Sequence, residues 1–143
     1  MARVDPIGFV ITDLKTNAAA VLALLPNAKR IQGNEKRTPS PCVVVGVGVD
    51  RPSISAPRGR VRDLTLNFRC FAPKSPTGDI EARALALAVG DYLDLKGPRV
   101  SAGGVGIYKS LESNTSGVII DPESGEPMVL VVVGFKTAAY PVA

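Results

Sequence analysis

The sequence predicts an α+β fold, in which an antiparallel or mixed sheet of about four to five strands carries two helices packed on one face. Two segments repeat apolar residues every three or four positions, as helices do, and residues 61–71 alternate apolar with polar residues, as a half-buried strand does. Together with valine-rich runs at 43–49 and 129–133, these segments indicate the order α-β-β-α-β-β. The 143 residues, 45% hydrophobic and 21% charged, suit a single domain spanning 1–143.

The first helix is expected to run from Ile7 to Leu25. Asp5 and Pro6 are a start signal, because a carboxylate accepts hydrogen bonds from free N–H groups and a proline ring sets φ for the first turn. Pro26 ends the run, since its ring would clash with the preceding turn. The apolar side of this helix consists of Ile7, Val10, Ile11, Leu14, Ala18, Val21, Leu22 and Leu25.

Three strand candidates come next. A short strand is expected near Lys29–Gln32, and a second over Cys42–Val49 is expected to place its valines at 43, 45, 47 and 49 on one face. The clearest strand is Val61–Phe71, which Pro73 follows.

The second helix is expected from about Pro76 or Asp79 to Leu95, with a stop signal at 97–98. Its predicted apolar face consists of Ile80, Ala84, Leu85, Ala88, Tyr92 and Leu95. Residues 104–113 and 128–139 are expected to be strands, joined by a connection with a strand end at 118–120 and turn residues at 121–127.

The closing strand is apolar on both of its faces, which two helices cannot cover together. Val129, Val131, Val133 and Phe135 face opposite to Met128, Leu130 and Val132. A second copy of the chain would cover the remaining face, and the alternative is a middle strand in a sheet that folds over on itself.

The composition argues against catalysis. The chain has no His, which removes the commonest general base, and no Ser-x-x-Lys pattern offers a lysine in its place. The glycines at 46–48 and 103–106 lack the context of a phosphate-binding loop, and the acidic residues at 121–126 fit a hairpin tip better than a cation site. We therefore expect no enzyme, no cofactor and no metal.

Export and membrane insertion are also disfavoured. Cys42 and Cys70 are expected to be small buried hydrophobes in a reducing cytoplasm, rather than a disulfide. Apolar runs such as Met128–Val133 are far shorter than the roughly 20 residues of a membrane-spanning helix. Charged residues interrupt the N-terminal region where a signal peptide would lie.

Positive charge is concentrated in one part of the chain. Residues 29–69 hold nine Lys and Arg against three Asp and Glu, a net charge of +6, whereas the remainder holds eight against ten, a net charge of −2. Basic loops of this kind suit phosphates or an acidic protein rim, or they are ordinary solubilising loops. The few aromatic residues disfavour a base-stacking platform.

The order and texture of these elements resemble the tail terminator proteins (tail completion or head–tail joining proteins) of long, non-contractile-tailed phages, the group of the lambda terminator. The features that carry the resemblance are an opening helix that ends in Val-Leu-Ala-Leu-Leu-Pro26, the loop Pro-Ser-Pro-Cys-Val-Val-Val45, the strand ending in Phe-Arg-Cys-Phe-Ala-Pro73, the helix through Glu81-Ala-Arg-Ala-Leu85, and the strand Met-Val-Leu-Val-Val-Val-Gly-Phe135.

The resemblance implies a structural virion protein, made in the bacterial host cytoplasm and located in the neck of the tail. It implies a ring of six copies that caps the tail tube, ends tail polymerisation and joins the tail to the head connector, while genomic DNA passes through the lumen without sequence-specific binding. The partners would be further copies, the tail tube protein and the connector or stopper protein. The residues expected at these interfaces are Lys36, Arg37, Arg51, Arg58, Arg60, Arg62, Val131, Val133 and Phe135.

Two alternatives remain open from the sequence. One is another neck or connector component of the virion. The other is a small ferredoxin-like ligand-binding or enzymatic domain, which would carry a discrete pocket with perturbed titratable groups.

Overall fold

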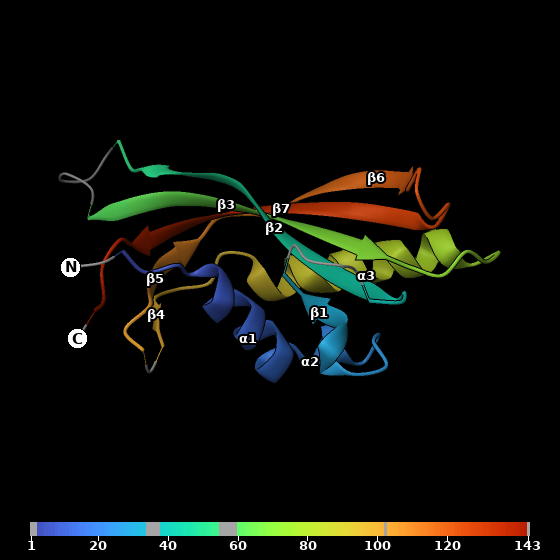
Figure 1. Ribbon diagram of the computed structural model, residues 1–143, viewed down its shortest axis with the longest axis horizontal. Helices are drawn as coiled ribbons and strands as arrows, with labels where there is room; N and C mark the ends of the chain where they lie inside the picture. The colour runs from blue at the N-terminus through green and yellow to red at the C-terminus, as the bar shows by residue number, and fades with distance from the viewer. Residues whose placement is uncertain (1–2, 34–37, 55–59, 102, 143) are drawn as a thin grey trace.

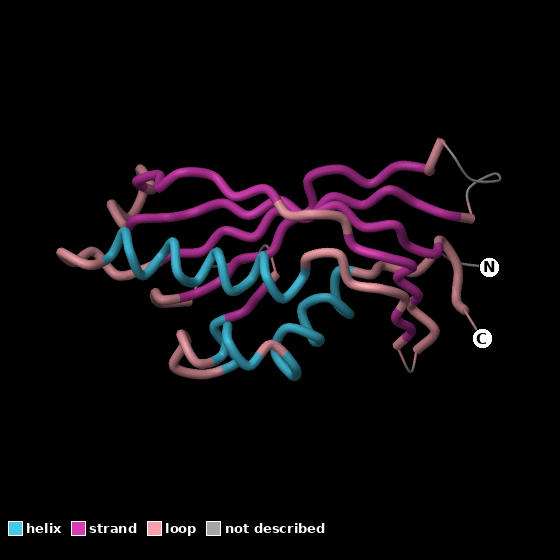
Figure 2. Tube along the Cα trace, turned by 180° about the vertical axis from the view of Figure 1, so that it is seen from behind, coloured by secondary structure: helices cyan, strands magenta, loops and turns pink. Residues whose placement is uncertain are grey.

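The strands form one mixed sheet, and the helices lie on one side of it (Figures 1 and 2). The computed structural model describes residues 3–33, 38–54, 60–101 and 103–142. The α+β class is confirmed, but the described residues form seven strands and three α-helices, more than predicted. In chain order, the elements are α1 (Ile7–Asn17), α2 (Ala19–Leu22), a 3-10 turn (Ala28–Arg30), β1 (Ile31–Gln32), β2 (Cys42–Pro52), β3 (Val61–Phe71), α3 (Gly78–Leu93), β4 (Arg99–Val100), β5 (Gly106–Ser110), β6 (Asn114–Ile120) and β7 (Pro127–Ala138).

The strand order is β1-β2-β3-β7-β5-β4, with β6 also paired to β7. β1 runs parallel to β2, and the other pairings are antiparallel, so the sheet is mixed. β3 pairs with β7 along its whole length, from 61 opposite 138 to 71 opposite 128. The other edge of β7 is shared, because β5 pairs with residues 135–137 and β6 with residues 127–132.

The predicted first helix is two helical segments. The backbone leaves the helix at Ala18, where ψ is 71°, and the second segment ends at Leu22. The start signal is confirmed, since the Asp5 carboxylate accepts a hydrogen bond of 3.1 Å from the Ile7 N–H group. The apolar spacing continues across the break and Val21 stays buried, so periodicity alone could not reveal the kink.

A β-bulge changes which residues of β2 share a face. Val47 lies opposite Leu66, but the register shifts at Gly48 and Val49 lies opposite Thr65. Val49 therefore points to the other side of the sheet from Val47, and the predicted common face of the four valines is wrong. Val47 and Val49 are both exposed.

The main core lies between the helices and one face of the central strands. Leu64, Leu66 and Phe68 of β3 are buried there, and their partners across the β3–β7 pair are Phe135, Val133 and Val131. This alternation confirms the predicted packed face of 61–71 and the opposite faces of the closing strand.

The helix α3 packs directly on β7, β3 and β6, and its predicted face is correct only in part, at Leu85 and at the half-buried Ala88 and Tyr92. The side chains that it buries are Ala82, Leu85, Ala86, Val89 and Leu93. Ile80 and Leu95 were predicted to pack and are instead 71% and 72% exposed. The helix is rich in alanine on more than one side, so the apolar pattern did not single out the side that contacts the sheet.

Candidate functional site

Three of the predicted basic interface residues lie at one end of the sheet, where β2 ends and β3 begins. Arg51 lies opposite Asp63 in the β2–β3 pair and is 61% exposed, and Arg60 is also exposed. The side chain of Arg62 is only 12% exposed, because its Nε donates a hydrogen bond of 2.7 Å to Asp50 Oδ1. Lys36, Arg37 and Arg58 lie outside the described residues.

An ion pair ties the central strands together at this end. Lys136 of β7 lies opposite Asp63 of β3, and its ammonium group donates a hydrogen bond to the Asp63 carboxylate. This hydrogen bond holds the pKa of Asp63 below its ordinary value, with help from the charges of Lys136 and Arg51. The lysine therefore neutralises part of the local negative charge, and sequence spacing could not show the pair because 73 residues separate its members.

The three predicted interface residues of the closing strand lie in the core of the chain itself. Val131, Val133 and Phe135 are 0%, 0% and 1% exposed. They occupy the face of β7 that α3 covers, which corrects their placement on an accessible surface. The opposite face of β7 carries Met128, Leu130 and Val132, which are half-buried.

This opposite face is partly closed by the chain. Cys42, Val44 and Phe71 form a small buried cluster there, against which Met128 packs. Further along, the Leu111 side chain lies over Gly134, where a Cβ would come within 3.1 Å of it. The rest of the face carries no described helix, as the views from front and back show (Figures 1 and 2).

Sequence patterns missed most of β6, of which only residues 118–120 were expected as a strand end. All of its residues but Ser116 are exposed, including the apolar Val118, Ile119 and Ile120. An exposed apolar strand of this kind is a common contact surface for another chain. Its weak signal has a physical cause, because polar residues fill its first half and a register shift separates Thr115 from Val118.

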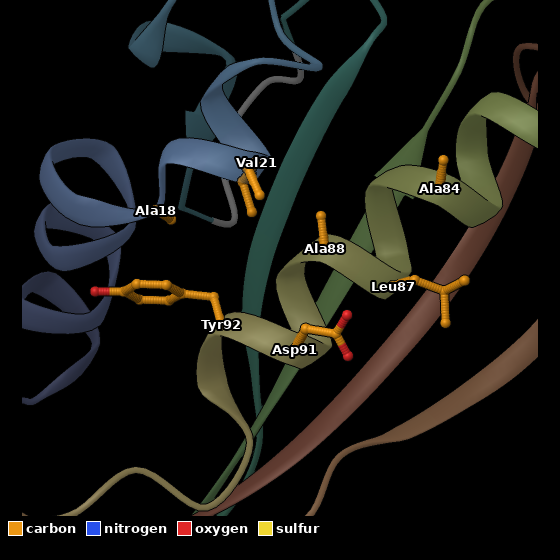
Figure 3. Close-up of a pocket in the computed structure, with 8 residues that line it drawn as sticks. Ala18, Val21, Ala84, Leu87, Ala88, Asp91 and Tyr92 are labelled. Carbon is orange, nitrogen blue, oxygen red and sulfur yellow. The ribbon is translucent and has the colours of Figure 1, made fainter.

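A shallow apolar groove runs between α2 and α3 (Figure 3). Its volume is about 470 Å³, and it is lined mainly by alanines together with Val21, Leu87, Asp91 and Tyr92. A second groove of about 420 Å³ lies along the same helix and includes Leu24 and Ile80. The small side chains leave these hollows, and Asp91 is the one carboxylate in the lining of the first.

The Tyr92 hydroxyl is engaged with α1 and not with the groove. It donates a hydrogen bond of 2.9 Å to Asp13 Oδ1, and Figure 3 shows the ring reaching across toward that helix. Burial and the Asp13 carboxylate raise the pKa of Tyr92 to about 12. The Tyr92 hydroxyl, whose pKa is raised, thus links α3 to α1, which is a structural role.

The cysteines point to opposite faces of the sheet. Cys42 lies opposite Phe71, and Cys70 lies opposite Val43, so adjacent positions of the ladder send the two side chains apart. Both are free and buried, and burial raises the pKa of the Cys70 thiol. The prediction of two buried, unpaired cysteines is confirmed.

Within the described part of the chain, no three His, Cys, Asp or Glu side chains gather as a metal site would require. None of the described helices has the length and apolar character needed to cross a membrane. The described surface presents a charged end of the sheet, an exposed edge strand and apolar hollows beside α3.

No family model matches the sequence. No curated protein is similar to it in sequence. Solved structures nevertheless share the fold. A chain of a structure described as the virion of a native gene transfer agent (GTA) particle matches with a TM-score of 0.60 at 17% identity, over 91% of this chain and 92% of that one. A second solved chain, whose name states no function, matches with a TM-score of 0.60 at 16% identity, over 94% and 97%. This chain thus shares its fold, over nearly its whole length, with a polypeptide of the gene transfer agent virion.

Proposed function

We propose that the chain is a structural virion protein without enzymatic activity, and specifically a tail terminator. In this role, six copies form a ring that caps the tail tube, ends its polymerisation and joins the tail to the head connector. The genome passes through the ring without sequence-specific contacts. The observation that carries the proposal is the fold shared with a chain of the gene transfer agent virion over about nine tenths of both chains.

The described surface supports an assembling subunit. Bulky apolar side chains remain exposed on β6, as well as on the helical side at Leu24, Ile80 and Leu87. Exposed apolar side chains that gather in this way, as Leu24 and Ile80 do in one groove, are typical of contacts with other chains. The grooves beside α3 bring no set of polar groups together, which suits a protein contact better than recognition of a small ligand.

The test is removal of the gene from cells that produce the particle, followed by electron microscopy. We expect tails of uncontrolled length and heads without tails, since tube growth then lacks its cap. Complementation with the wild-type chain restores joined particles of uniform length. Tails of normal length that fail to join heads would instead assign the chain to another part of the neck, and unaltered particles would refute a virion role.

A further inference from the structure

One end of the sheet exposes cations. Arg51 and Arg60 lie at the ends of β2 and β3 that face each other, and Lys109 of β5 lies opposite Lys136. Arg51, Arg60 and Lys109 are all exposed, and we call them the basic end. Arg62 pairs with Asp50, and Asp63 pairs with Lys136 and also lies 3.9 Å from Arg51 Nε, so two carboxylates meet three cations in these ion pairs. The exposed surface of this end is therefore positive.

The opposite end of the sheet exposes carboxylates. Asp79 and Glu81 lie in the first turn of α3, and Glu123 lies in the turn between β6 and β7. These two segments are adjacent, since a Cβ on Gly78 would lie 2.9 Å from Pro127 Cγ. The exposed Lys74 also lies here, since a Cβ on Gly125 would be 3.9 Å from its Nζ, and the three carboxylates outnumber it. We call Asp79, Glu81 and Glu123 the acidic end.

The two ends are too far apart to attract each other within one copy. The eleven residues of β3 run from the basic end to the acidic end, which corresponds to roughly 35 Å of extended chain. Exposed charges at that separation are screened at physiological salt, where the Debye length is about 8 Å. The opposite charges can therefore interact strongly only when two copies meet.

Each end also exposes large apolar side chains beside its charges. Ile54, 90% exposed, follows β2 at the basic end, where Tyr108 of β5 is 46% exposed. At the acidic end, Ile80 of α3 is 71% exposed and Ile120 of β6 is 58% exposed. Apolar contacts with charges around them are the usual composition of a specific interface, in which charge sets the orientation.

We propose that the basic end of one copy docks against the acidic end of the next. Such a head-to-tail contact uses two different surfaces of each copy, and it generates a closed ring when the rotation between copies closes. This inference rests on the proposed ring, and it identifies the two surfaces through which neighbouring copies in that ring meet. The partner recognised by the basic end is thus a second copy of this chain.

Two single charge reversals test the contact, Arg60→Glu at the basic end and Glu123→Lys at the acidic end. Both residues are exposed, so the reversals are expected to leave the fold intact. The matched control reverses an exposed charge near the C-terminal end of α3, away from Asp79 and Glu81 in its first turn, as Asp91→Lys. The readout is the mass of each purified protein by light scattering across a concentration series, at about 50 mM and about 500 mM salt.

We expect the wild-type chain and the Asp91→Lys control to associate at low salt and to dissociate at high salt. Each end variant alone is expected to associate about tenfold more weakly, because like charges then meet at the contact. An equimolar mixture of Arg60→Glu and Glu123→Lys is expected to recover association. Every contact in an alternating assembly then joins opposite charges, and a ring with an even number of copies can close.

Three outcomes would overturn the proposal: a wild-type chain that stays monomeric at low salt, end variants that associate like the control, or a mixture that fails to recover. If the chain binds duplex DNA, and Arg60→Glu abolishes DNA binding but leaves the association between copies unchanged, nucleic acid is the partner of the basic end and the proposed contact between copies is wrong. None of these results alters the gene-removal experiment, so failure of the interface and failure of the virion role are distinguishable.

Discussion

Neighbouring valines on β7 provide a direct test of which face of the sheet is the core. Val133 is 0% exposed beneath α3, whereas Val132 is half-buried on the face without a described helix. The variants Val133→Ala and Val132→Ala remove the same atoms from adjacent positions of one strand. The loss of β-propensity is similar in both, so the difference between them reports packing.

The expected magnitudes follow from burial. Val133→Ala removes two carbons from the core, a transfer loss of about 1.6 kcal/mol, and leaves a cavity beside Leu66, its partner across β3. We expect its free energy of unfolding to fall by about 2–3 kcal/mol. For Val132→Ala, the expected fall is about 0.5–1 kcal/mol, because solvent already reaches part of that side chain.

Urea unfolding followed by circular dichroism measures both values. Low protein concentration and about 0.5 M salt keep copies apart, so the transition reports the single chain. Equal losses for the two variants, or a larger loss for Val132→Ala, would refute the assignment of faces and with it the register of β3 against β7.

Three further variants test local features of the structure. The variant Gly78→Ala is expected to destabilise the chain by about 1–3 kcal/mol in urea unfolding, because the new Cβ would lie 2.5 Å from the backbone oxygen of Pro73. The variant Gly8→Ala in α1 places a Cβ with nothing within 4 Å, and it is expected to stabilise the chain by up to about 1 kcal/mol. The pKa of Tyr92 is raised to about 12, so its contribution to stability is present below pH 10 and is lost as the pH rises toward 12. The variant Tyr92→Phe is therefore expected to flatten the decline of Tm over that range. An unchanged decline would contradict the hydrogen-bonded, partly buried hydroxyl. Because the pKa of Asp63 is lowered in the folded chain, its contribution to stability is present above pH 3.8 and is lost as the pH falls through the folded pKa. The variant Asp63→Asn is expected to remove that part of the decline in Tm at acidic pH. An identical acid profile would contradict the ion pair with Lys136.

Local patterns predicted the regular strands well, because the alternation of apolar and polar residues along a strand indicates which of its faces is buried. The predicted bounds of 61–71 are those of β3, and the predicted closing strand at 128–139 differs from β7 by one residue at each end. The same reasoning failed where two sides of an element are equally apolar or where the register shifts. Thus the buried side of α3 was predicted only in part, and the face of Val49 was assigned incorrectly.

The candidate contact surfaces were likewise predicted from the sequence only in part. The concentration of positive charge in residues 29–69 is a property of the sequence, and so is the acidic turn at 121–126. The placement of Arg51 and Arg60 at the other end of the sheet from that turn is not, because it depends on β3 and β7 pairing along their full length. Arg69 of the same basic region lies at the end of the sheet near the turn, opposite Leu130. Likewise, the sequence marked the closing strand as apolar on both faces, but only the position of α3 decided that Val131, Val133 and Phe135 are internal.

By itself, the sequence determined the α+β class, the central strands and the absence of histidine chemistry, because each follows from residue type and short-range spacing. Tertiary structure alone decided the kink at Ala18, the pairing of β6 with β7, the buried side of α3 and the charged ends. These features arise from contacts between residues far apart in the chain, where the free energy of packing outweighs the small local preferences that a pattern can record.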